Sequence, residues 1–393
     1  MKKLTHAVLL AGVVTIGVST AALAADEPPP PAPAADAAKP AEPAKPTGPT
    51  LGDVLGASGI SITGYVDAAY EHLSSTGAFT SGVANRVFDF EPSSFNLHQA
   101  AITIAKQPTE GFGALVNLTA GKDADVIHSF NQTSSNFDLT QAFVQYATGP
   151  LTLIGGKFVT LAGAEVINST QDTNYSRSIL FGYAIPFTHT GARATFAASD
   201  VVSVIVGINN GWDQLKDENK QKTVELGVSV TPNKVFSMSA QGYSGKEQVS
   251  GPFDPIGGTR NLIDLVGTVN ATDQLTFILN YDYGTQDNAT SLVNGSTIKA
   301  KWTGLAAYVN LQLAEQWRLS LRGEYFDDKD GYRTGVIQKW KEATLTLAFL
   351  PTKNAEIRAE VRGDKSNHNS FLQSDGTGKD TQSSVGLEAI YKF

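Results

Sequence analysis

From residue 60 onward, hydrophobic and polar positions alternate with a period of two, in stretches of about ten residues that end in turn residues. The alternation is clearest in residues 355–364, where alanine, isoleucine and valine on one face oppose glutamate, arginine and aspartate on the other. Residues 275–284, 304–313, 317–326, 342–349 and 383–393 repeat the pattern. It predicts β-strands with one apolar and one polar face. Residues 137–147 give no consistent apolar face, so the orientation of that strand stays open.

The connections between these stretches alternate between short and long. Short links fall near residues 107–110, 148–150, 199–200, 232–233, 271–272, 314–315 and 351–353. Longer polar stretches lie around residues 71–93, 122–135, 160–188, 211–221, 245–259, 285–297, 327–336 and 365–381. Alternation alone also fits a water-soluble sandwich, but this parity of connections is typical of short periplasmic turns and long extracellular loops. We therefore predict an all-β fold, a transmembrane antiparallel β-barrel of about 16 strands.

Aromatic positions agree with a membrane barrel. Trp317, Phe349 and Tyr391 fall near predicted inner strand ends, and Tyr283 and Tyr325 near outer ends, as the two aromatic girdles require. The chain ends on an alternating strand at Phe393, which resembles the signal by which outer-membrane barrels are recognised for assembly. The expected partners are therefore the barrel-assembly machinery, through Phe393, together with outer-membrane lipid and lipopolysaccharide.

The N-terminal residues predict export. Two lysines precede an apolar run over residues 7–18, and Ala-Leu-Ala follows at 22–24, so residues 1–24 read as a cleaved signal peptide. Residues 25–52 are rich in proline and alanine and predict a disordered periplasmic tether. Residues 53–393 remain for the barrel, which we place in the outer membrane of a Gram-negative bacterium.

Composition and motifs narrow the chemistry. The 393-residue chain has a formal net charge of -8 and no cysteine, which argues against a nucleic-acid partner and excludes disulfides and thiolate metal sites. Walker-type and H-E-x-x-H motifs are absent from the sequence, and its histidines are dispersed. We expect no catalytic residues, no metal site and no cofactor.

The polar faces carry the candidate functional residues. A barrel of about 16 strands is too wide for its side chains to fill, so polar inward faces would line water. The charged positions assigned to this pore-lining face are Arg193, Asp282, Arg318, Arg322, Glu324, Glu356, Arg358, Glu360 and Arg362. Such charges tune ion preference in channels, although paired and solvated charges with no role in permeation would give the same pattern.

A long polar stretch over residues 161–188 predicts a loop with apolar residues of its own. Loops of this kind are usually functional. Folded inward, it would constrict the pore and place Glu165, Asp172 and Arg177 in the path of solutes. Folded outward, it would pack on the rim or cap a neighbour.

Several segments carry a resemblance to a known family. Residues 61–67 (SITGYVD), 138–146 (DLTQAFVQY) and 155–158 (GGKF), followed by 174–178 (NYSRS) and 186–191 (PFTHTG), resemble the OmpL-like β-barrel porin family of Gram-negative bacteria. The resemblance implies an outer-membrane barrel that passes small solutes, and it points to Arg177 and His189 as positions to test. It also leaves a homotrimer open as the assembly.

The predicted function is an outer-membrane porin, a water-filled channel for passive diffusion of small hydrophilic solutes and ions. The alternative is a structural or adhesive barrel with a plugged pore and a periplasmic tether. A barrel lipase would need serine and histidine together on the lipid face, and no outward pair of this kind is visible in the sequence.

Overall fold

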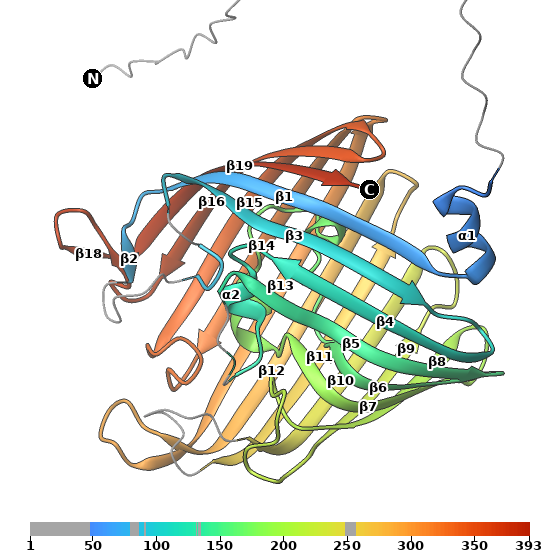
Figure 1. Ribbon diagram of the computed structural model, residues 1–393. Coiled ribbons are helices and arrows are strands. Elements are labelled where there is room, and N and C mark those ends of the chain that lie inside the picture. The colour runs from blue at the N-terminus through green and yellow to red at the C-terminus, as the bar shows by residue number, and fades with distance from the viewer. Residues whose placement is uncertain (1–47, 79–85, 90–91, 131, 133–134, 248–256) are drawn as a thin grey trace, which may run out of the picture. The chain divides into compact units, whose positions relative to one another are not determined.

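The computed structural model in Figure 1 describes residues 48–78, 86–89, 92–130, 132, 135–247 and 257–393. The expected signal peptide, residues 1–24, and residues 25–47 of the expected tether lie outside the described residues. Helix α1 (Leu51–Ser58) begins within the last two residues of the expected tether, 25–52, and ends just before the first strand. In the described part of the chain, no helix combines the length and apolar character that crossing a membrane requires.

Among the described residues, sixteen antiparallel strands close into a barrel, which confirms the predicted fold (Figure 1). Each strand pairs with its neighbours along the chain, and β1 pairs with β19 to close the circle. The strands are β1 (Ser61–Leu73), β3 (Ser94–Lys106), β4 (Gly111–Ala120), β5 (Phe137–Thr148), β6 (Leu151–Val159), β7 (Thr188–Ala197), β8 (Val202–Asn209), β9 (Thr223–Val230), β10 (Phe236–Glu247), β11 (Gly258–Asn270), β12 (Leu275–Thr290), β13 (Thr297–Ala314), β14 (Trp317–Asp328), β15 (Gln338–Thr352), β16 (Ala355–Ser366) and β19 (Thr381–Lys392).

The connections follow the predicted alternation, and all seven predicted short links join consecutive strands. At the other end of the barrel, β2 (Gly77–Ala78), β17 (Phe371–Leu372) and β18 (Gly378–Lys379) form a separate three-stranded sheet between two long loops. The short helix α2 (Ala124–Ile127) lies in the long connection between β4 and β5. One predicted loop is shorter than expected: β12 and β13 stay paired up to Thr290 and Thr297, because polar residues continue the ladder beyond residue 285.

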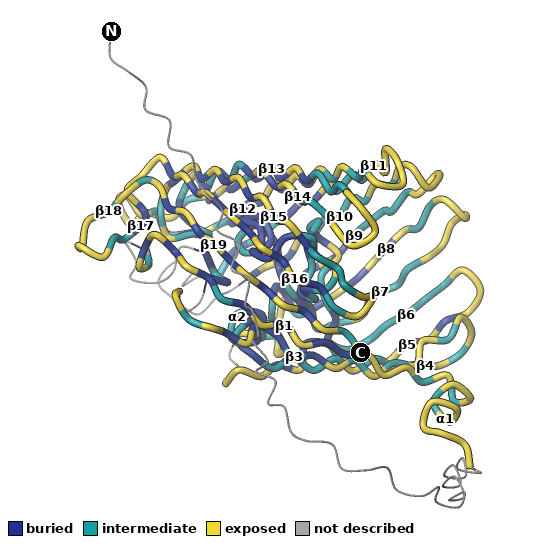
Figure 2. Tube along the Cα trace, turned by 90° about the horizontal axis from the view of Figure 1, so that it is seen from above, coloured by how far each residue is buried: buried dark blue, intermediate teal, exposed yellow. Residues whose placement is uncertain are grey.

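The two faces of the strands differ in burial as the alternation requires (Figure 2). On β16, Ile357 and Val361 are 42% and 50% exposed, whereas Arg358 between them is fully buried on the inner side. Near the short turns, Trp317 and Phe349 contact each other on the outer surface, with ring centroids 4.8 Å apart. An apolar outer face bounded by aromatic residues is the surface that a bilayer covers.

Strand β5 has no consistent face in the sequence because it contains a β-bulge. Its pairing with β4 shifts at Thr140, which has no partner in that ladder. Phe137 and Leu139 are exposed before this point, whereas Val144 and Tyr146 are exposed after it. One extra residue turns every later side chain to the opposite face, so a search for strict alternation fails across residues 137–147.

The C-terminal residue completes the closure of the barrel. Phe393 and Gly64 exchange two backbone hydrogen bonds, 2.8 Å from Phe393 N to Gly64 O and 2.9 Å from Gly64 N to Phe393 O. The Phe393 ring lies over Gly64, where a Cβ atom would come within 2.5 Å of the ring and 2.7 Å of the Ala101 carbonyl oxygen. The lack of a side chain at residue 64 therefore allows the terminal ring to seat against β1.

We predict that Gly64→Ala weakens the seam between β1 and β19. The added methyl group must displace both the ring and a backbone oxygen, and overpacking of this kind costs about 1–3 kcal/mol. The heat-induced mobility shift of the folded protein in gel electrophoresis should occur at a lower temperature. Gly363→Ala is the matched control, because a Cβ atom there meets nothing within 4 Å. Equal unfolding temperatures for the two variants would contradict this role of Gly64.

Candidate functional site: the inward loop and its charged anchors

The connection between β6 and β7, residues 160–187, folds into the barrel. It contains two short helical turns, η1 (Ser169–Gln171) and η2 (Leu180–Ala184). Ile179, Leu180 and Phe181 are buried, and they belong to one apolar cluster with Trp302 on β13 and Phe326 on β14. The sequence left the direction of this loop open, and the structure places it inward.

Two carboxylates on the barrel wall hold the backbone of this loop. Glu360 accepts hydrogen bonds from the backbone N–H groups of Tyr175 and Ser176, at 2.7 and 3.1 Å. Glu324 accepts from the N–H groups of Ile179 and Leu180, at 2.9 and 3.1 Å. Hydrogen bonds to an ionised acceptor are roughly twice as strong as neutral ones. The loop is therefore fixed at two points along β14 and β16.

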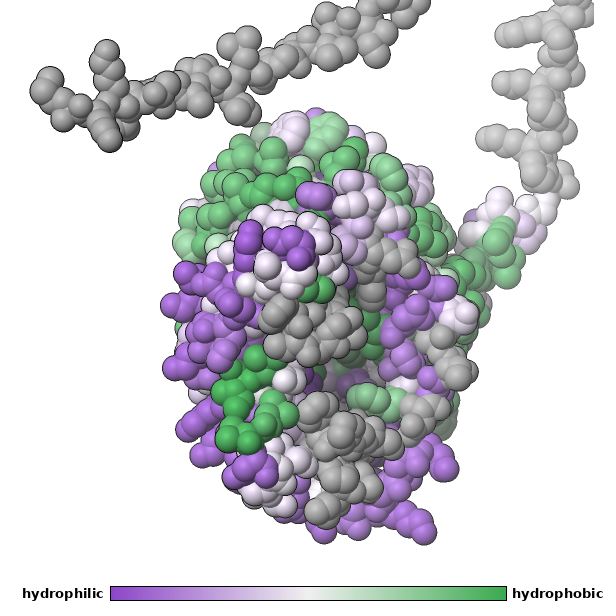
Figure 3. All heavy atoms as spheres, turned by 90° about the vertical axis from the view of Figure 1, so that its left-hand side faces the viewer, coloured by the Kyte–Doolittle hydropathy of each residue, from purple (hydrophilic) through white to green (hydrophobic). Residues whose placement is uncertain are grey.

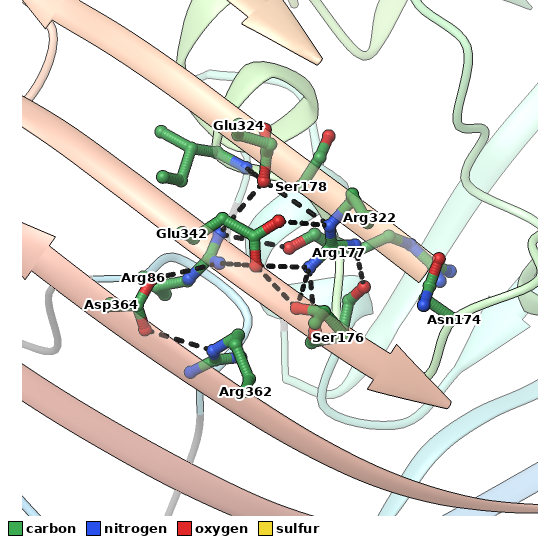
Figure 4. Close-up of polar contacts among 12 residues, drawn as sticks. Arg86, Asn174, Ser176, Arg177, Ser178, Arg322, Glu324, Glu342, Arg362 and Asp364 are labelled. Atoms are coloured by element: carbon green, nitrogen blue, oxygen red, sulfur yellow. Dashed lines mark hydrogen bonds and ion pairs between the residues drawn. The ribbon is translucent and has the colours of Figure 1, made fainter. Parts of the chain in front are cut away.

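Arg322 lies at the centre of the contact between the loop and the wall (Figure 4). Its guanidinium group pairs with Glu165 of the loop at 2.8 Å and with Glu342 of β15 at 2.9 Å. It also donates to the carbonyl oxygen of Ser176 at 2.5 Å. The side chain of Arg322 has no exposed surface, so this arginine joins the loop to two strands rather than facing open water.

Arg358 anchors the first half of the loop through its carbonyl groups. It donates to the carbonyl oxygens of Asp172 and Asn174 at 2.7 and 3.2 Å. Its charge is balanced by Glu356 at 2.6 Å and Glu388 at 3.0 Å. Wall carboxylates thus receive the N–H groups of the loop, and a wall arginine donates to its carbonyl groups.

A second inward segment comes from the connection between β1 and β3. Arg86 pairs with Glu342 at 3.3 Å and with Asp364 at 3.1 Å (Figure 4). Asp89 accepts two hydrogen bonds from Arg362, at 3.1 and 2.5 Å. Sequence reasoning missed these residues: Glu342 could have been found from its period-two position, but nothing local marks Arg86 or Asp89 as inward.

The residues predicted to line the pore all lie on the inner face, and most are covered. The side chains of Arg322, Arg358 and Arg362 are 0% exposed, whereas that of Arg318 is 16% exposed. The other members of the set, Arg193, Asp282, Glu324, Glu356 and Glu360, are buried as well. Arg193 pairs with Glu225 at 2.9 Å, and Asp282 lies opposite Asp264 on the neighbouring strand.

The three predicted constriction residues lie within the hydrogen-bonding network of the loop. Arg177 pairs with Asp172 at 2.9 Å and donates to the carbonyl oxygen of Ile167 at 2.8 Å. Glu165 accepts from the N–H group of Ser178 at 2.6 Å. All three are 5–7% exposed. The structure therefore places these charges in the contacts that hold the shape of the loop, and their position in the path of solutes stays a prediction.

The tip of the loop also contacts the wall beyond β16, on β19 and β3. The Tyr175 hydroxyl lies 3.2 Å from Nε2 of His98 on β3, and its ring packs on β19 at Gly386, where a Cβ atom would come within 2.7 Å of it. A cavity of only about 10 Å³ remains beside these contacts, lined in part by Asp67, Asp123 and Arg177. At this level the loop leaves little space against β1, β3 and β19.

The end of the loop is fixed by the connection after β8. Asp213 accepts hydrogen bonds from the backbone N–H groups of Phe187 and Thr188, both at 2.8 Å. Burial raises the pKa of the Asp213 carboxyl to about 6, although these hydrogen bonds act in the opposite direction. His189, singled out by the resemblance, is fully buried, with its ring stacked on that of Tyr243 at 4.9 Å.

A closed barrel of sixteen strands with a loop folded into its lumen is a porin-like outer-membrane barrel. Residues 59–393 match the family described as "Putative beta-barrel porin-2, OmpL-like", and the chain belongs to this family. The sequence resemblance is thereby confirmed, and the family and fold imply the outer membrane of a Gram-negative bacterium. No curated protein matches the chain in sequence.

Solved structures show the same fold at low sequence identity. An anion-selective porin from Comamonas acidovorans is similar with a TM-score of 0.61 and 12% identity, over 85% of this chain and 99% of that one. OprB of Pseudomonas putida gives 0.60 and 12%, over 86% and 96% of the two chains. The trimer form of OmpT from Vibrio cholerae gives 0.58 and 12%, over 85% and 99%.

We predict that Glu360→Gln loosens the loop. The amide group that replaces one carboxylate oxygen cannot accept from both Tyr175 and Ser176, and a buried donor left without an acceptor costs about 1–3 kcal/mol. Hydrogen exchange of these two amides, measured by mass spectrometry, should become roughly ten-fold faster or more. Gln171→Ala, at an exposed position of the same loop, should leave the exchange rate unchanged. Unchanged protection in Glu360→Gln would show that the loop does not depend on this anchor.

Proposed function

We propose that this protein is a porin through which small hydrophilic solutes and ions diffuse passively, with no covalent step. The observation that carries the proposal is the loop over residues 160–187, which is held inside a closed barrel by charged wall residues such as Arg322 and Glu360. A narrowed lumen with polar walls selects solutes by size and charge. Membership of a porin family supports the same reading.

A structural barrel with a plugged pore is the second candidate, and two observations favour it. Apolar residues of the loop form one buried cluster with the wall strands, and the cavity beside Tyr175 has a volume of only about 10 Å³. In such a protein the loop would be a permanent plug, and the proline-rich segment would tether the barrel to the envelope.

Single-channel recording separates these two functions. The refolded mature chain is inserted into a planar bilayer and the current is recorded across a salt gradient. We expect stable current steps with a measurable reversal potential. A sealed bilayer, obtained with protein whose folded state has been verified by its heat-modifiable gel mobility, would overturn the porin proposal and favour the plugged barrel.

We propose that Arg318 contributes most of the accessible positive charge among the four arginines of β14 and β16. Arg318 has the only side chain of the four with exposed surface, at 16%, and among the described residues its ion pair is with Glu356. Arg322, Arg358 and Arg362 serve as anchors in this proposal. A change of charge at residue 318 should therefore alter the ion selectivity while the loop keeps its position in the barrel.

We predict that Arg318→Glu shifts ion preference toward cations. A change of two charges acting over about 8 Å of water alters the energy of a monovalent ion by about 1 kcal/mol, or about five-fold in the permeability ratio. The reversal potential in a salt gradient measures this ratio, and Arg318→Gln should give about half the shift in free energy. Lys106→Glu, at an exposed position at the turn end of β3, is the control with the same change in charge. An equal reversal potential in wild type and both Arg318 variants would remove Arg318 from the solute path.

Export and assembly complete the proposal. Residues 1–24 would direct secretion and be cleaved, residues 25–52 would remain in the periplasm as a tether, and Phe393 would be recognised by the barrel-assembly machinery. One of the similar structures is described as a trimer form, and we propose a homotrimer for this chain on that basis.

A further inference from the structure

We propose that a lysine-lined hollow on the outer surface of β14, β15 and β16 binds the phosphate groups of lipopolysaccharide in the outer leaflet. The hollow has a volume of about 370 Å³ and is lined by Tyr325, Lys339, Lys341, Lys365, Ser366 and Asn367. We call this set the lysine hollow. Figure 3 looks onto the loop end of the barrel and shows hydrophilic residues gathered along its rim.

The lysine hollow lies on the membrane side of the wall, not in the lumen. Along β15, Lys339 and Lys341 are exposed and continue the outward series that contains Leu345 and Leu347, which are 40% and 38% exposed. On β16, Lys365 continues the outward series of apolar residues in the same way. The inward residues between them are buried against the loops. The three lysines therefore face whatever surrounds the barrel.

The height of the lysine hollow matches the polar boundary of the outer leaflet. Phe349 and Trp317 contact each other near the periplasmic turns. Lys341 is eight residues from Phe349, which is about 27 Å along a strand at about 3.4 Å per residue. With strands tilted by about 40°, this corresponds to roughly 20 Å along the membrane normal, close to the ~25 Å height of the apolar band. The lysines lie where that band ends.

The lysine hollow carries more positive than negative charge, which favours binding of an anion. Lys341 and Lys365 lie directly opposite each other on paired strands, an arrangement of like charges that is destabilising without a counter-charge. Lys339 and Lys365 each have one carboxylate at 3.8 Å, Asp327 and Asp380. Within the described part of the chain, no carboxylate lies within 4 Å of the Lys341 ammonium group. Three positive charges thus face two negative ones, with Lys341 left for an external anion.

The neighbouring groups suit a phosphorylated sugar. Asn367 uses its Oδ1 atom to accept from the backbone N–H group of Lys339 at 2.6 Å, so its amide nitrogen faces further partners as a donor. Tyr325, which pairs with Lys341 across β14 and β15, is half-buried and brings a phenol hydroxyl to the same wall. Lysine binds phosphate as a compact point charge, and hydroxyl and amide groups bind sugar hydroxyls.

The location of the charge favours the outer leaflet over the inner one. At the periplasmic end of the same three strands the outward strand residues are Trp317, Phe349 and Ile357, and the turn between β15 and β16 adds one lysine, Lys353, against the three lysines of the hollow. A patch that served general attraction to anionic lipid would be expected at either end. Lipopolysaccharide carries its phosphates on glucosamine sugars, whereas the phospholipids of the inner leaflet carry theirs on glycerol. The lysine hollow lies at the loop end of these strands, which is the lipopolysaccharide side of the membrane.

The test compares two triple variants of the refolded mature chain in detergent. K339Q/K341Q/K365Q removes the charge of the lysine hollow, and K106Q/K234Q/K353Q removes the same charge from exposed positions at or near periplasmic turns. Binding of lipopolysaccharide and of the same lipid after enzymatic removal of its phosphates is measured by native mass spectrometry. The folded state of each variant is checked by its heat-modifiable gel mobility.

We expect the first variant to bind phosphorylated lipopolysaccharide roughly a hundred-fold more weakly than wild type, since each lysine near a phosphate surface contributes about five-fold. The control variant should bind as wild type does, and dephosphorylated lipid should bind all three proteins equally weakly. Equal affinities of wild type and the first variant for the phosphorylated lipid would overturn the proposal.

Two further results would assign the hollow to another ligand and also overturn the proposal. Displacement of the lipid by millimolar inorganic phosphate would indicate a site for small free anions. Loss of oligomers in the first variant by analytical ultracentrifugation, with lipid binding unchanged, would identify the hollow as a contact between copies of this chain. None of these results depends on whether the barrel conducts ions.

Discussion

The structure depends on the pairing of buried charges between the inward loop and strands β14 to β16. Burying an unpaired charge costs several kcal/mol, and the side chains of Arg322, Arg358 and Arg362 have no exposed surface beneath the loop and the segment that carries Asp89. Each of these arginines is surrounded by carboxylates from the wall, from the loop or from the segment that carries Asp89. The loop cannot leave its position without unpairing Arg322 from Glu165 and removing the carbonyl groups to which Arg358 donates. Wall, loop and the segment around Arg86 therefore act as one electrostatic unit.

The same constraint explains why so much charge faces inward. Most of residues 160–187 lies outside regular secondary structure, so its backbone groups have no ladder to join, and buried backbone groups must be satisfied somewhere. Glu324 and Glu360 accept its N–H groups, and Arg322 and Arg358 donate to its carbonyl groups. A charged inner wall is thus needed to hold an irregular loop in the lumen, independently of any role in permeation. Inward charge alone does not identify a residue that contacts solutes.

The sequence predicted the barrel well because strand parity is a local property. Apolar and polar residues two positions apart identify the outer and inner faces, and the lengths of the connections identify the two ends. The prediction failed to assign faces on β5, because Thr140 has no partner on β4 and the side chains after it point to the opposite face. It also could not foresee the loop contacts, because Arg86 and Asp89 meet Glu342 and Arg362 across more than 250 positions of the sequence. Which charges face water depends on what covers them, and that information is not local.

Period-two alternation also separates two surfaces that share the same strands. On β14 to β16 the inward positions hold the loop, while the outward positions run from Trp317 and Phe349 through an apolar band to Lys341 and Lys365. Successive side chains point to opposite sides of a wall one strand thick, so an outward residue and the inward anchors next to it in the sequence face different surroundings. A substitution on the inner face of a strand can therefore leave the outer face unchanged, and the reverse. Residues at the bulges and at the seam between β1 and β19, such as Gly64, couple the two surfaces, because a shift there moves the strand itself.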